Sequence, residues 1–209
     1  MQHLGYEPCK ADPDLWMKKE CQPDNGLVYY AYMLFYVDDC LCIQHDAVEC
    51  LNKIDKFFHV KEGLIGDPNI YLGVKLQKVK LNNRVDCWAL LPSKYVQEAI
   101  DTAEKYIQSE WGIDELPKTG SGPWPSDFVS ETDESPELDP KRANYFQSLV
   151  KTMNWMVELG RVDIITETLV LALHMTMPRE GHWDAVLHVL GCLKCKCTAR
   201  MVFDPTYPK

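Results

Sequence analysis

Two adjacent carboxylates, Asp38 and Asp39, are the residues of this chain best placed to do chemistry. They follow an apolar, aromatic run over residues 27–37 and precede a second β-forming run over 40–44. Two such runs around a short polar break predict a β-hairpin with both carboxylates at its tip. Carboxylate oxygens held out on a rigid turn are ligands that Mg²⁺ prefers. The alternative is a polar turn without chemistry, which is the common meaning of an isolated Asp-Asp pair.

The two residues before the pair favour the metal-binding interpretation. Tyr36 and Val37 complete the tetrapeptide Tyr-x-Asp-Asp, which arises by chance in about one chain in fifty of this length at average residue frequencies. Such a pair fits two-metal chemistry, in which ions roughly 4 Å apart activate a hydroxyl and stabilise a leaving pyrophosphate. Tyr36 and Val37 would shape the floor of the groove beside the reacting end.

The elements that must position this hairpin are predicted from periodicity. Asp46 is expected to cap a helix that runs to about Phe58. Residues 70–91 alternate and turn at 82–83, which predicts a second hairpin. Its aromatic residues Trp88 and Tyr71 are interpreted as core rather than as stacking platforms.

The rest of the chain is predicted to be mainly helical. A helix is expected from Pro92 to about Ile107, with one face formed by Tyr95, Ala99 and Ala103. Residues 112–140 hold eight acidic residues and one lysine and have no period, so a linker or long surface loop is expected there. Three more helices are expected to begin at Asp139-Pro140, near Asp163 and near His182. The tail over 199–203 is expected to be a strand without partners.

Composition limits the class of protein. The net charge of −9 argues against nucleic-acid binding, but residues 141–209 carry nine basic and six acidic residues. Nine scattered cysteines indicate reduced thiols rather than a disulfide framework. With no signal peptide and no long apolar run, an intracellular protein without a membrane partner is expected. Cys192, Cys195 and Cys197 with His182 and His188 could be zinc ligands, but their spacing fits no common structural zinc pattern and favours plain packing.

Six motifs in a consistent order resemble the copia-type LTR retrotransposon reverse transcriptase, a part of the Pol polyprotein. They cover nearly the whole chain. The matching segments are 4–6 with 11–16, 36–39, 71–76, 92–96, 145–150 with 162–164, and 182–185. Two positions depart from the family pattern, because Lys151 stands where Gly is usual and Val162 where Pro is usual.

The resemblance implies an α+β fold built from parts of a polymerase. The implied parts are a partial palm (an antiparallel sheet with helices) over 1–91, a thumb-like helix over 92–111, the acidic segment 112–140, and a helical connection region over 141–209. In the family a ribonuclease H domain follows, and it is absent from this chain. The family's first catalytic aspartate lies upstream of the motif at 11–16, so this chain is expected not to polymerise by itself.

The resemblance also assigns roles. It makes Asp38 and Asp39 the catalytic, metal-binding carboxylates and gives Tyr71, Leu72 and Gly73 to the primer grip. It also implies that Lys75, Lys78, Lys80 and Arg84 contact the nucleic-acid backbone. The alternative is that these residues form the solvent-exposed face of a strand and bind nothing.

The implied activity is RNA-directed DNA polymerase, a nucleotidyltransferase. Its implied cofactor is Mg²⁺ or Mn²⁺, and its partners are RNA/DNA primer–template, dNTPs and other parts of the Pol polyprotein. The cytoplasm is the expected location, with virus-like particles and the nucleus left open. The alternative function is a non-catalytic, transposon-derived nucleic-acid-binding or interaction protein.

Overall fold

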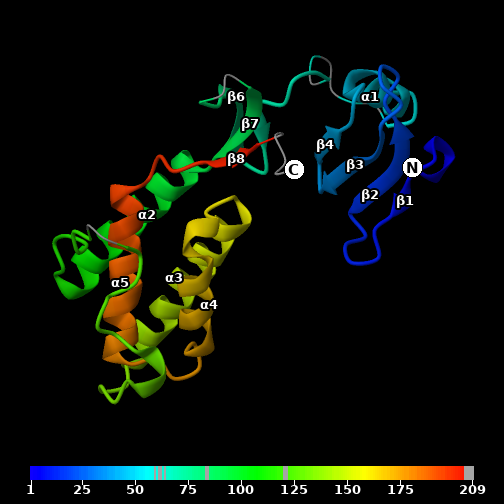
Figure 1. The fold of residues 1–209 in the computed structure, drawn as a ribbon. Coiled ribbons are helices and arrows are strands. Elements are labelled where there is room, and N and C mark those ends of the chain that lie inside the picture. The colour runs from blue at the N-terminus through cyan, green and yellow to red at the C-terminus, as the bar shows by residue number, and fades with distance from the viewer. Residues whose placement is uncertain (59, 61–62, 64, 83–84, 120–121, 205–209) are drawn as a thin grey trace. The chain divides into compact units, whose positions relative to one another are not determined.

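The chain folds into two compact units, Met1–Leu72 and Gly73–Lys209, whose helices and strands are labelled in Figure 1. Each unit has its own hydrophobic core. The structure is a computed structural model that describes residues 1–204 except 59, 61–62, 64, 83–84 and 120–121. It is mixed α+β with two antiparallel four-stranded sheets, which confirms the predicted class of fold. None of its described helices is long and apolar enough to cross a membrane.

The first unit is an antiparallel meander with one covering helix. After a short 3₁₀ turn (η1, Gln2–Leu4), its strands follow the order β1-β2-β3-β4. Their bounds are Glu7–Pro8 for β1, Leu15–Cys21 for β2, Val28–Tyr36 for β3 and Asp39–Ile43 for β4. Alternation along β3 turns Ala31 and Met33 inward, where both are fully buried, and leaves Tyr30 and Tyr36 on the other face.

Helix α1 (Ala47–Asp55) covers the inner face of this sheet. The Asp46 side chain accepts a hydrogen bond from the Glu49 amide at 3.0 Å, which confirms the predicted cap. Cys50 and Ile54 of α1 join Tyr6, Ala31 and Met33 in the core. The helix ends before the predicted Phe58, whose side chain is exposed.

The second sheet confirms the predicted hairpin and corrects the prediction for the tail. Its strand order is β5-β6-β7-β8, with β5 at Ile70–Tyr71, β6 at Val74–Lys80, β7 at Asp86–Leu91 and β8 at Met201–Phe203. The expectation that the tail strand has no partner is wrong, because β8 pairs with β7 and sets Phe203 opposite Trp88. The predicted turn at 82–83 lies partly outside the described residues.

Four helices build the core of the second unit. They are α2 (Ser93–Trp111), α3 (Pro140–Glu158), α4 (Ile165–Leu173) and α5 (Glu180–Cys195), with 3₁₀ turns η2 (Ser130–Thr132) and η3 (Val162–Ile164). Asp139 caps α3 by accepting hydrogen bonds from two amides of its first turn, as predicted. Ala103 of the predicted face of α2 is buried, together with Val96, Ile100 and Ile107. The other two predicted residues, Tyr95 and Ala99, are partly buried against the same core.

The acidic segment 112–140 is packed against α5 along the part that the structure describes. Leu116 and Leu138 are buried in the helical core. Gly191 of α5 lies so close to this segment that a Cβ atom there would be 2.0 Å from the Pro117 carbonyl oxygen. A surface loop thus helps to close the core, because its few apolar residues face α5.

Candidate functional site

The Asp-Asp pair sits at the tip of the β3–β4 hairpin, as the sequence predicts. Pairing runs in register up to Tyr36 and Asp39, so Val37 and Asp38 form a two-residue turn. The side chains of Asp38 and Asp39 are exposed, and Val37 is 89% exposed. Tyr36 lies directly opposite Asp39 and shares its sheet face, away from the face that α1 covers.

The backbone of this turn is strained. Val37 has φ +51°, a left-handed conformation in which a β-branched side chain is an outlier. Two-residue hairpins with a positive φ at the first central position usually place glycine there. A residue held in this way costs on the order of 1–3 kcal/mol, and such strain is concentrated at functional sites.

A second residue with a strained backbone, Leu72, contacts the hairpin through Asp39. Leu72 has φ +52°, and its amide donates a hydrogen bond to Asp39 Oδ2 at 3.2 Å. Val37 and Leu72 are the only non-glycine residues with positive φ in the described part of the chain. The Leu72 bond holds one oxygen of Asp39 and thereby orients the carboxylate.

Tyr71 lies beside the same carboxylate. Partial burial raises the pKa of its phenol, and the negative charge of Asp39 adds to that effect. Two of the three residues assigned to the primer grip, Tyr71 and Leu72, are therefore brought to the predicted site. The third, Gly73, begins the second unit and has φ +76°.

The donor atoms at the hairpin suit a hard divalent cation. Asp38 and Asp39 supply carboxylate oxygens on a solvent-exposed turn, and such oxygens are the ligands of Mg²⁺ and Mn²⁺. Within the described residues no group of three or more His, Cys, Asp or Glu side chains is arranged to hold a metal ion.

The predicted backbone-contact lysines do not form one cluster. Strand alternation places Lys75 on the face of β6 opposite to Lys78 and Lys80. The Lys78 ammonium lies 5.0 Å from the ring centre of Trp88. The Lys80 Nζ atom lies 3.9 Å from Asp86 Oδ1. Arg84 is outside the described residues.

The structure also forms an aromatic row that the sequence did not reveal. Trp88, which the sequence assigned to the core, is only half-buried, and its strand partners on one face are Lys78 and Phe203. Phe203 is 47% exposed. The three residues of β8 do not indicate which distant strand they pair with, so this row could not be predicted from the sequence.

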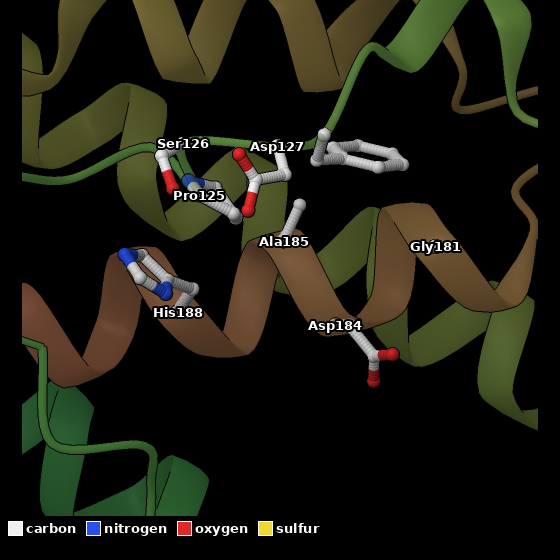
Figure 2. A pocket seen from close by; sticks show the side chains of 8 residues that line it. Pro125, Ser126, Asp127, Gly181, Asp184, Ala185 and His188 are labelled. Carbon is white, nitrogen blue, oxygen red and sulfur yellow. The ribbon is translucent and has the colours of Figure 1, made fainter.

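The two histidines that could be zinc ligands by sequence, His182 and His188, lie in different surroundings. His182 is buried, accepts from the Arg179 amide at Nδ1, and has Nε2 3.2 Å from the Ser130 carbonyl. His188 lines an open pocket of about 430 Å³ between α5 and residues 125–128. Figure 2 shows Asp184 at the edge of this pocket, pointing away from the loop. Burial raises the pKa of Asp184.

Comparisons of the chain with protein-family models, with curated proteins and with solved structures found no match.

Proposed function

We propose that this chain is part of a copia-type reverse transcriptase and that Asp38 and Asp39 are carboxylates of its metal site. The observation that carries the proposal is the strained turn at Val37, which presents two adjacent carboxylates to solvent. The order of six family-like motifs supports the same conclusion. The reaction is RNA-directed DNA synthesis on a primer–template with dNTPs.

Each residue at the hairpin has a separate role in the proposed site. Asp38 and Asp39 would hold Mg²⁺, and the bound ion would supply the positive charge that favours attack by the primer hydroxyl and departure of pyrophosphate. The Leu72 amide fixes the orientation of Asp39. Tyr36 shares the face of Asp39 and forms the floor beside the primer end, and Tyr71 borders it.

Mn²⁺ binding followed by NMR tests this metal site. Substoichiometric Mn²⁺ should broaden the backbone amide signals of residues 36–40 and of Leu72 more than those of the rest of the chain. The double variant Asp38→Asn/Asp39→Asn should lose this local broadening, whereas Asp24→Asn, which changes another exposed turn of the first unit, should keep it. Broadening that ignores the double substitution would rule out the proposed site.

Primer extension with Mg²⁺ or Mn²⁺ tests the activity of the chain itself. In this family three carboxylates position the two ions, and the hairpin supplies two. The 209-residue chain is therefore expected to extend no primer. Template-dependent extension that Asp38→Ala abolishes would contradict this expectation and indicate a complete active site.

A second candidate function is non-catalytic binding of nucleic acid, and the row of Lys78, Trp88 and Phe203 favours it. Aromatic rings beside cations are surfaces on which bases stack, at about 1–3 kcal/mol per base. This function predicts salt-dependent binding of a fluorescent primer–template that Asp38→Ala leaves unchanged. Trp88→Ala should weaken that binding roughly tenfold.

A further inference from the structure

Two histidine rings are stacked inside the second unit, where α4 ends and α5 begins. His174 follows the last residue of α4, and His182 lies in the first turn of α5. Their ring centres are 4.0 Å apart and their planes differ by 19°. His182 is 2% exposed and His174 is half-buried. These two residues, called the histidine pair below, both belong to the second unit.

The hydrogen bonds of His182 require a neutral ring. Its Nδ1 atom accepts from the Arg179 amide at 3.0 Å, so Nδ1 carries no proton. Its Nε2 atom lies 3.2 Å from the Ser130 carbonyl oxygen and donates to it in the neutral form. The first bond caps α5, and the second ties the acidic segment to the helix. A proton added at Nδ1 removes the acceptor and leaves the Arg179 amide without its partner.

The acidic segment is bound to the same turn of α5 by further hydrogen bonds. The Glu180 amide donates to the Pro136 carbonyl oxygen at 3.0 Å. The Gly181 amide donates to Ser135 Oγ at 2.9 Å. Residues 130–138 and the N-terminus of α5 thus form one junction, and His182 is part of it.

The surroundings of the histidine pair favour neutral rings. Burial lowers the pKa of His174, and the neighbouring His182 ring adds to that effect. Glu131 and Asp133 act in the opposite direction, but their effect is smaller. Asp133 Oδ2 lies 3.8 Å from His182 Nδ1, and the Asp133 side chain is 7% exposed. The two carboxylates therefore offset only a part of the cost of a positive charge on the pair.

Two arginines near the pair have acidic partners of their own. At the N-cap of α5, the Arg179 guanidinium lies 3.6 Å from Glu137 Oε1. On α3, Arg142 lies 2.6 Å from Glu180 Oε1. Because both cations are paired, the response of the junction to a moderate fall in pH depends mainly on the histidines.

We propose that the histidine pair makes this junction pH-sensitive: it holds the acidic segment on α5 near neutral pH and loosens it in acid. Two rings stacked 4.0 Å apart repel each other when both are charged, so the closed junction keeps at least one of them neutral. In the open junction both rings meet water and take up protons at the ordinary histidine pKa of about 6.5. The open form then binds more protons, and the junction loses stability as the pH falls below about 6.5. This response is independent of the metal site, which lies in the first unit.

Amide hydrogen exchange of the whole 209-residue chain tests the junction at about pH 7.5 and about pH 5.5, one unit on each side of the ordinary histidine pKa. The Glu180 and Gly181 amides are the reporters, because both donate across the junction. After correction for the intrinsic exchange rates, their protection should fall about tenfold more than that of the α3 amides, the factor for one ring kept neutral in the closed form. An equal fall in both places, or no fall, overturns the proposal.

A double variant without titratable rings identifies the cause. In His174→Phe/His182→Gln, phenylalanine keeps a ring at position 174, and glutamine at the third helical position can still accept from the Arg179 amide. This variant should lose the pH-dependent difference. His188→Gln is the matched control on α5, since glutamine can keep the bond to the Gly122 carbonyl oxygen, which lies 3.1 Å from His188 Nε2. A difference that the double variant retains, or that the control also loses, overturns the proposal.

The ring signals of the wild-type chain give a test that needs no substitution. Histidine ring protons followed by NMR from about pH 8 to about pH 5 report the titration of each ring. At least one ring of the pair should titrate below the ordinary value of about 6.5. If both rings titrate at that value or above it, the closed junction does not exclude protons and the proposal is wrong.

Discussion

At the tip of the β3–β4 hairpin the chain exposes Val37 in a strained conformation beside two carboxylates, whereas α5 buries most of its residues. His182 has both ring nitrogens engaged, and Gly191 leaves no room for one more carbon atom. The hairpin combines a strained backbone with exposed charge, whereas the helical core is closely packed. We therefore expect substitutions in the closely packed core around α5 to change the free energy of unfolding more than substitutions at the exposed hairpin.

The largest effect is expected at the tightest contact of the core. Gly191→Ala places a methyl group against the Pro117 carbonyl oxygen, so either α5 or the acidic segment must move. The free energy of unfolding should fall by about 3 kcal/mol, measured by urea denaturation. Gly122→Ala is the control, since a Cβ atom there meets nothing within 4 Å. Equal stability of the two variants would mean that the loop does not pack on α5.

A smaller effect is expected at the ion pair before α4. Hydrogen bonds from the buried Arg161 guanidinium lower the pKa of Asp163. Asp163→Asn should cost about 2 kcal/mol near pH 7, less than a fully buried pair, because the Asp163 side chain is 48% exposed.

The same pair predicts a pH dependence with a definite sign. A carboxyl whose pKa is lower in the folded state stabilises the fold above its ordinary pKa of about 4. That contribution is lost as the pH falls through the folded-state pKa. Denaturation of Asp163→Asn at several pH values should therefore show a weaker acid dependence than the wild type, and Asp114→Asn, an exposed control, should not. Identical acid profiles would contradict the pairing.

The smallest effect is expected at the hairpin, and it has the opposite sign. Val37→Gly removes the penalty of a β-branched residue at positive φ but adds chain entropy to the unfolded state. The free energy of unfolding should rise by about 1 kcal/mol. A loss of stability would show that Val37 is not strained and would remove the contrast between the two regions.

Local signals in the sequence predicted most of the elements. Asp46 and Asp139 cap helices, and the break at 37–38 forms a hairpin, because each depends on a few neighbouring residues. The prediction failed where distant residues decide. The strand at 201–203 was expected to be unpaired, but it pairs with β7.

Sequence patterns were enough to predict the carboxylate pair, its place at a hairpin tip and most helices and strands after residue 27, whereas β1 and β2 were not predicted. The tertiary structure shows what these patterns could not predict: the Leu72 amide reaches Asp39, 33 positions away, and Val37 is strained. It also decided that α4 turns Leu169 outward and Thr168 inward. Periodicity states which residues share a face, but the neighbouring elements of the fold determine which face is covered.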